Sequence, residues 1–277
     1  MGIFEGFGSV VDEWLGIDND WDGASPRYVH QTSLNRLIDR GPDVGDGPTL
    51  VNDLYSRLLN NWDKKPSRGR QNWRHTQNVG VRENNPSPEI TLQRTFMQAM
   101  EAKNDTDWAN EVPVASGVAD TGPDKVDFVE KTDDGYSMIE LKWPQPNYTD
   151  ENPLKAAIQV LRYGLAYVFS KENAESLGYK TMIRDKPILD ASTVHLRVLA
   201  PKHFYEPFTS TNDWFNTLEI ALNLGISRLA EKHKFTMSFA FEQFPPTFEW
   251  PADCDDDNTT TKVVGAFQDR KRVFCVQ

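Results

Sequence analysis

The pattern of apolar and polar positions along this chain predicts a succession of helices and strands. Apolar residues recur every three or four positions in several stretches, as on the buried face of a helix; in one of them Leu50, Leu54 and Leu58 mark that face. The helices expected on this basis cover residues 1–15, 49–62, 87–102, 153–170 and 213–233. In the third, Ser87 can cap the helix and Pro88 suits its first turn.

Shorter stretches of apolar and β-branched residues predict strands. They cover residues 111–116, 126–131, 136–143, 192–200 and 234–243, and residues 270–274 fit either a last strand or a basic tail. The turn sequence from Thr132 to Gly135 joins the second and third strands into a hairpin. From residue 87 the order is helix, three strands, helix, strand, helix and strand, which is typical of an α/β fold with a mixed sheet.

The domain organisation follows from this order. Residues 87–277 are expected to form the core, and residues 1–86 a helical and loop elaboration at its N-terminal side, the two making one compact unit. The chain is 277 residues long, with 38% hydrophobic and 26% charged residues, which is a globular composition.

Charge and cysteine content narrow the class of protein. Thirty Lys and Arg residues oppose 41 Asp and Glu residues, and the net charge of −11 argues against a general polyanion binder but permits a local basic groove. No run reaches the roughly 18 apolar residues that a membrane helix needs, and the N-terminus lacks the basic residues of a signal peptide. Two cysteines, Cys254 and Cys275, provide no disulfide framework. We expect a cytoplasmic protein without a membrane partner.

The segment from residue 126 to residue 143 combines charged and apolar positions in a way that suggests chemistry. Alternation along the second strand of the hairpin places Ile139 and Leu141 on one face and Glu140 and Lys142 on the other. With suitable register, Asp127 on the first strand lies beside Glu140. Two neighbouring carboxylates repel each other unless a cation joins them, and Mg²⁺ prefers such hard oxygen ligands.

These residues also match a known motif. Asp127, followed after twelve residues by Glu140-Leu141-Lys142, resembles the motif of the PD-(D/E)XK nuclease superfamily. Asp127 fits the strand register best because Phe128 and Val129 follow it. The alternatives for the first aspartate are Asp124, which follows Pro123, and then Asp120.

Two further features strengthen the resemblance. Glu89, in the first turn of an expected helix, stands where the family often has an upstream acidic residue. Gln159 and Tyr163 resemble the Gln-x-x-x-Tyr signature of the RecB-like and lambda-exonuclease-like branch, and their i, i+4 spacing puts them on one helix face. The likeness covers about residues 87–170, extends at most to residue 243, and leaves the first 85 residues unexplained.

The resemblance implies a restriction-endonuclease-like core with a central mixed β-sheet flanked by helices, and a nuclease that hydrolyses DNA phosphodiester bonds with a metal-activated water. The residues implied to hold Mg²⁺, with Mn²⁺ as a substitute, are Asp127, Glu140 and Glu89. Lys142 is implied to orient the water or to offset charge on the phosphate. Gln159 and Tyr163 are implied to shape the site or to bind the strand.

A basic segment supplies a second signal for nucleic acid. Residues 64–82 contain six Lys or Arg residues and no acidic residue. Such local charge in an acidic protein is typical of a loop that follows phosphates, and an aromatic residue within it can stack on an unpaired base. The residues expected to contact nucleic acid are Lys64, Lys65, Arg68, Arg70, Trp73 and Arg74, and Arg82 contributes the sixth charge.

Two other functions remain open. One is a catalytically silent member of the same fold that binds nucleic acid or protein, and the other is an unrelated α/β interaction protein in which the motif is a coincidence. A protein partner or self-association is compatible with the sequence. Asp18, Asp20 and Asp22 resemble the start of an EF-hand loop, but Val29 replaces its bidentate glutamate, so we expect an acidic loop there.

Overall fold

The computed structural model describes residues 2–18, 20–21, 23–66, 71–80, 87–114, 124–144, 151–179, 186–209, 213–250 and 257–274. Its helices are α1 (Phe7–Trp14), α2 (Gln31–Arg40), α3 (Gly47–Asn61), α4 (Pro88–Ala102), α5 (Pro153–Glu172), α6 (Lys202–Thr209), α7 (Trp214–Lys232) and α8 (Asp257–Gln268), with short 3-10 turns η1 (Arg27–Val29) and η3 (Pro187–Asp190). Its strands are β1 (Trp108–Pro113), β2 (Lys125–Lys131), β3 (Tyr136–Leu141), β4 (Thr193–Ala200), β5 (Thr236–Gln243) and β6 (Lys271–Arg272).

The strands of the described chain form one six-stranded mixed sheet in the order β1 to β6. β2 runs antiparallel to both of its neighbours, β1 and β3; β3, β4 and β5 run parallel, and β6 returns antiparallel to β5. The expectation of an α/β fold with a mixed sheet flanked by helices is confirmed. Because β3, β4 and β5 are parallel, their carboxyl ends meet at one edge of the sheet, and residues that follow β3 lie there.

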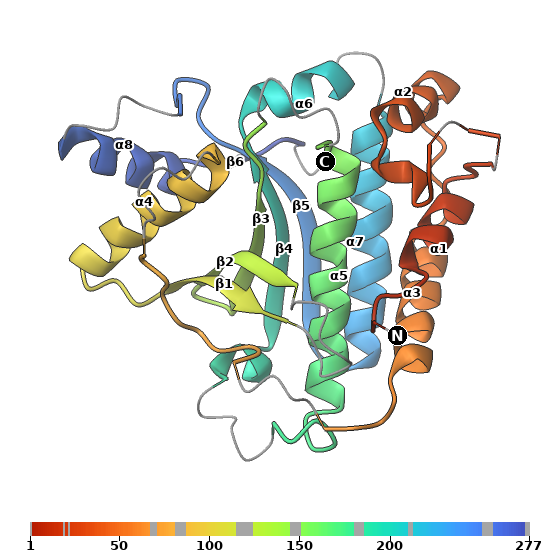
Figure 1. The fold of residues 1–277 in the computed structure, drawn as a ribbon, viewed down its shortest axis with the longest axis horizontal. Coiled ribbons are helices and arrows are strands. Elements are labelled where there is room, and N and C mark those ends of the chain that lie inside the picture. The colour runs from red at the N-terminus through yellow and green to blue at the C-terminus, as the bar shows by residue number, and fades with distance from the viewer. Residues whose placement is uncertain are drawn as a thin grey trace.

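Helices cover both faces of the sheet (Figure 1). α5 and α7 lie directly against one face, with α3 and α1 outside them, and α4 and α8 cover the other face. Each face has its own hydrophobic cluster: Met138 of β3 belongs to the larger one, and its neighbour Ile139 to the smaller one. The larger cluster contains Leu54 of α3 together with Val160 of α5, so α3 shares a core with the helix that packs on the sheet.

The local sequence signals are present in the structure. The Ser87 side chain accepts a hydrogen bond from the Ile90 amide, and Pro88 opens α4. The Thr132 amide donates to the Gly135 carbonyl at 2.9 Å, which closes the turn between β2 and β3. These elements form where expected because their determinants lie within a few residues of each other.

Other elements differ from the expectation. α2, α6 and α8 were not expected, although Leu34, Leu37 and Ile38 of α2 stand at helical spacing; α6 contains Pro207. β1 begins at Trp108 instead of residue 111. Residues 270–274 were expected to form either a last strand or a basic tail, and the structure shows a two-residue strand there, β6.

Within the described residues, no helix is both long and apolar enough to cross a membrane.

The close packing of α3 against α7 generates a stability prediction. A Cβ atom at Gly225 would lie 2.5 Å from the Gly47 carbonyl oxygen and 2.6 Å from Val51 Cγ2. Gly225→Ala is therefore expected to lower the free energy of unfolding by about 1–3 kcal/mol, the usual cost of overpacking.

Gly265→Ala in α8 is the matched control, because a Cβ there meets nothing within 4 Å. It is expected to raise the free energy of unfolding by up to about 1 kcal/mol through helix propensity alone. Urea denaturation measures both variants. Equal effects of the two substitutions would contradict tight α3–α7 packing.

Candidate active site

Acidic side chains surround Lys142 at the carboxyl end of β3. Lys142 Nζ lies 2.6 Å from Glu140 Oε1, 3.7 Å from Glu151 Oε2 and 3.9 Å from Glu89 Oε1. The predicted alternation holds, because Ile139 belongs to the cluster under α4 while the Glu140 side chain meets α5. Glu140 is 1% exposed and Lys142 is 6% exposed, so the structure buries this pair instead of leaving it on the surface.

Asp127 lies beside Glu140, as expected from the hairpin. Phe128 pairs with Ile139, so continuation of this register sets Asp127 opposite Glu140. β2 stops pairing with β3 at that point, and Asp127 Oδ2 accepts a hydrogen bond from the Leu141 amide at 2.9 Å. The carboxylate thus takes the place of a backbone partner, which holds it against β3.

An unusual residue on β1 faces Asp127. Glu111 has a φ of 50° and stands between the pairs Asn110↔Phe128 and Val112↔Val126. A left-handed conformation in a strand interior is strained for a residue other than glycine, and such strain often accompanies functional sites. The ladder is therefore irregular on both sides of Asp127.

The first turns of α4 connect to both strands of the hairpin. Glu89 Oε2 accepts a hydrogen bond from the Trp143 amide at 3.1 Å. Gln93 Nε2 donates to the Asp127 carbonyl oxygen at 2.7 Å. These contacts set the helix start, and with it the Glu89 carboxylate, next to the end of β3.

The Gln/Tyr pair of α5 contacts the same site. The Tyr163 hydroxyl donates to Glu140 Oε2 at 2.8 Å, and Gln159 Nε2 donates to the Tyr163 hydroxyl oxygen at 2.9 Å. The structure therefore brings together all six residues that were singled out for the site: Glu89, Asp127, Glu140, Lys142, Gln159 and Tyr163.

Burial and mutual repulsion of the acids determine the electrostatics. Burial raises the pKa of Glu140 and of Glu89, and it raises the pKa of Asp127 well above its ordinary value with a further contribution from Glu140. Burial also opposes the charged form of Lys142, but the surrounding carboxylates, Glu140 foremost, raise the pKa of its ammonium overall. The surrounding carboxylates therefore favour the charged form of Lys142.

The composition of the cluster fits a divalent cation. Carboxylates outnumber ammonium groups around Lys142, their oxygens are the ligands that Mg²⁺ prefers, and an added cation would offset their repulsion. In the part of the chain that the structure covers, no three Asp, Glu, His or Cys side chains already converge as a metal-binding group. The Lys142 ammonium lies between the acids, so binding of an ion requires this side chain to shift.

The alternative aspartate lies elsewhere. Asp124 Oδ2 forms an ion pair with Arg162 Nη2, and no contact between Asp124 and Lys142 or Glu140 is seen. Arg162 also lies over the Phe4 ring, 4.5 Å from its centroid. The geometry favours Asp127 as the aspartate of the cluster.

The structure corrects the expectation for Trp73. Its side chain is fully buried and meets the Tyr167 ring edge-to-face at 5.8 Å, so it is a core residue and not a stacking platform for a base. Lys65 is exposed and pairs with Asp63 at 3.1 Å. Some residues named in the sequence analysis lie outside the described residues: Asp22, Arg68, Arg70, Arg82, Asp120, Pro123, Cys254 and Cys275.

The first part of the basic segment, Lys64 and Lys65, lies far from the carboxylates, whereas residues 71–80 continue to β1 and α4, where the Asn78 amide donates to Asn110 Oδ1 at 2.7 Å and Arg94 Nη1 donates to the Gly80 carbonyl oxygen at 2.9 Å. Trp62, which precedes the two lysines, contacts Phe169 near the end of α5, whereas Gln159 is in the first half of that helix. A rise of about 1.5 Å per residue separates Gln159 from Phe169 by about 15 Å. Lys64 and Lys65 are therefore not part of the acidic cluster.

Sequence reasoning missed Glu151 and Gln93. Glu151 stands just before the Asn152 cap of α5, and an acid at a helix start is a usual surface feature. Gln93 follows Glu89 by one helical turn, and that spacing is the one signal that pointed to it. Both are joined to the site by tertiary contacts that no local pattern reveals.

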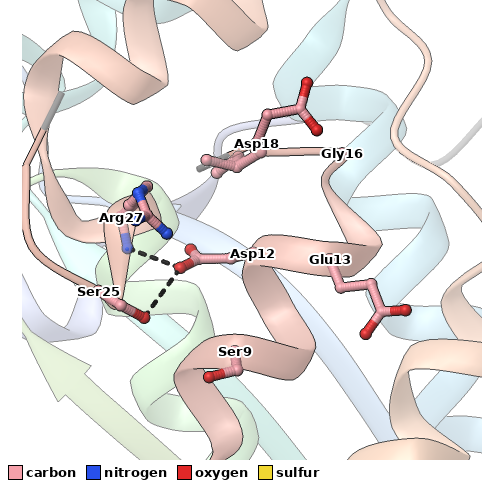
Figure 2. A pocket seen from close by; sticks show the side chains of 8 residues that line it. Ser9, Asp12, Glu13, Gly16, Asp18, Ser25 and Arg27 are labelled. Carbon is pink, nitrogen blue, oxygen red and sulfur yellow. Dashed lines mark hydrogen bonds between the residues drawn. The ribbon is translucent and has the colours of Figure 1, made fainter. Parts of the chain in front are cut away.

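The acidic N-terminal loop contributes to a separate cavity of about 490 Å³, lined by Asp12, Glu13 and Asp18 among others (Figure 2). Asp12 points toward the η1 segment and accepts hydrogen bonds from the Arg27 and Tyr28 amides, each at 2.8 Å. These bonds tie α1 to η1, so Asp12 has a structural role.

Comparisons with protein-family models, with curated proteins and with solved structures find no match to this chain. An argument about function therefore depends on the geometry of the acidic cluster.

The raised pKa of Asp127 generates a prediction about stability and pH. The folded protein binds this proton more tightly than the unfolded chain, so stability falls as pH rises from the ordinary to the raised pKa. In EDTA at pH 8, Asp127→Asn is expected to raise the free energy of unfolding by about 0.5–2 kcal/mol. At pH 4 the difference should nearly vanish.

Urea denaturation at both pH values measures this effect, and asparagine retains an acceptor for the Leu141 amide. If Asp127→Asn proves less stable than the wild type at pH 8, then Lys142 stabilises the Asp127 carboxylate more than burial and Glu140 destabilise it.

Proposed function

We propose that this protein is a metal-dependent nuclease that hydrolyses the phosphodiester bonds of DNA. The observation that carries the proposal is the buried cluster at the end of β3, where Glu140 and Lys142 leave one face of a strand together and Asp127 lies beside them. A structural ion pair needs one carboxylate. A cluster with several carboxylates and raised pKa values is typical of functional sites.

The arrangement of elements supports a PD-(D/E)XK, restriction-endonuclease-like core. Between α4 and β4 the chain forms three antiparallel strands and then α5, with the motif residues on β2 and at the end of β3. α5 brings Gln159 and Tyr163 onto Glu140. These contacts agree with the roles that the resemblance implies for the two residues.

The chemistry follows from the charges. Asp127, Glu140 and Glu89 would hold Mg²⁺ or Mn²⁺, and such an ion supplies a polarised phosphate and a water of lowered pKa. Because its pKa is raised, Lys142 is suited to donate hydrogen bonds to water or phosphate and not to take a proton. Tyr163 donates to one oxygen of Glu140 and leaves the other to a cation.

One observation favours a catalytically silent, binding member of the same fold. Glu140 and Lys142 are already paired as ions at 2.6 Å. A binding member would retain the fold and bind nucleic acid or protein without cleaving it.

An activity assay tests the proposal. Purified protein is expected to degrade DNA in Mg²⁺ or Mn²⁺ and not in EDTA, with linear and circular, single- and double-stranded substrates compared. Asp127→Asn and Lys142→Met are each expected to reduce the rate at least about a hundredfold, through loss of a metal ligand and of a hydrogen-bond donor.

Asp124→Asn is the matched control, because it removes the same charge three residues away from Asp127. It is expected to retain activity within about threefold, since Asp124 pairs with Arg162 outside the cluster. Metal binding without cleavage of any DNA or RNA would support the binding member instead. The absence of both metal binding and cleavage would refute the proposed nuclease function.

The basic segment is proposed to contact DNA beyond the cleaved bond. A distance of about 15 Å along α5 equals about four nucleotides of a strand at 3.4 Å each. Lys64→Glu with Lys65→Glu is expected to raise KM severalfold and to weaken its salt dependence, with kcat unchanged. Rates measured at several salt concentrations check this, and an unchanged KM would remove these two lysines from the DNA path.

A further inference from the structure

Glu151 is an acidic residue of the cluster, and one of its carboxylate oxygens has no hydrogen-bond donor. Its Oε1 lies 2.6 Å from Lys155 Nζ, while its Oε2 lies 3.7 Å from Lys142 Nζ. Oε2 is buried and accepts no hydrogen bond. A buried acceptor without a donor is unfavourable, so Glu151 offers Lys142 a second carboxylate within a short side-chain movement.

The chain anchors Glu151 through the residue that follows it. Asn152 is fully buried and caps α5, where its Oδ1 accepts from the Lys155 amide at 2.9 Å. Its Nδ2 donates to the Val29 carbonyl oxygen at 2.9 Å. The backbone at Glu151 is thus fixed both to the helix and to the N-terminal region, which keeps the carboxylate near Lys142.

A cation at the cluster would change the partner of Lys142. In the structure its ammonium contacts Glu140 Oε1, one of the oxygens that a divalent ion would need. Like charges repel strongly at such distances, so the ammonium would have to leave. Of the three glutamates around Nζ, Glu89 and Glu140 are assigned to the ion, and Glu151 remains.

We infer that Glu151 is a positioning residue for Lys142, whose ammonium it takes over when a divalent ion binds Glu140. This inference rests on the proposed metal-dependent function and adds a residue outside the motif. Without Glu151, the ammonium stays on Glu140 and competes with the ion for the same oxygen.

A double-mutant cycle on Mn²⁺ affinity tests the inference without using activity. Calorimetric titration of the full chain compares the wild type, Glu151→Gln, Lys142→Met and the double variant. Glu151→Gln is expected to raise the Kd for Mn²⁺ about tenfold. In the Lys142→Met background the same change is expected to stay within about twofold, because there is no ammonium left to reposition.

The controls separate this role from others. Glu101→Gln removes the same charge from the exposed end of α4 and is expected to leave the Kd within about twofold. Glu151→Asp, which keeps the carboxylate, is expected to lose less Mn²⁺ affinity than Glu151→Gln. Thermal unfolding in EDTA reports whether each variant folds, and Lys142→Gln replaces Lys142→Met in the cycle if the latter does not.

The outcomes distinguish failure of this inference from failure of the proposed metal-dependent function. An equal loss of affinity in both backgrounds means that Glu151 acts as a ligand or as a distant charge, and it overturns the inference. The inference is also overturned if Glu151→Gln leaves the Kd for Mn²⁺ unchanged while Asp127→Asn abolishes Mn²⁺ binding. A wild type that binds no Mn²⁺ overturns the proposed function itself.

Discussion

The buried ion pair between Glu140 and Lys142 is the constraint on which the rest of the site depends. Desolvation of two charges cancels much of their attraction, and removal of one partner from such a pair typically costs about 3–5 kcal/mol. The fold therefore has to keep both, and it adds a hydrogen bond from the Tyr163 hydroxyl to the second oxygen of Glu140. Replacement of such a pair by well-packed apolar residues is often neutral or stabilising, so stability alone does not account for the charges.

The surrounding architecture makes an accumulation of acids tolerable. Glu89 is in the first turn of α4, and Glu151 stands immediately before the cap of α5. Helix N-termini carry partial positive charge and favour nearby carboxylates. Two helix starts and the end of β3 thus converge, and the backbone amides of Leu141 and Trp143 hold Asp127 and Glu89 in place.

The sequence was informative where structure is determined locally. Alternation predicted the opposite faces of Ile139 and Glu140, and the turn at Thr132 predicted the hairpin that carries Asp127. Sequence spacing could not show that Trp73 is buried or that Glu151 faces Lys142. Both facts arise from contacts between segments far apart in the chain, such as Trp73 with Tyr167 and Asn152 with Val29.

Different interactions stabilise the core of the protein and its acidic cluster. Two large hydrophobic clusters surround the sheet, and the Lys142 ammonium already offsets part of the charge at the end of β3. The apolar clusters therefore supply the main driving force for folding, and Lys142 lessens the repulsion among the acids. A divalent ion would act directly on one lysine side chain and a few carboxylates, and because it would bind only the folded chain, it would also add to the stability of the fold in proportion to its affinity.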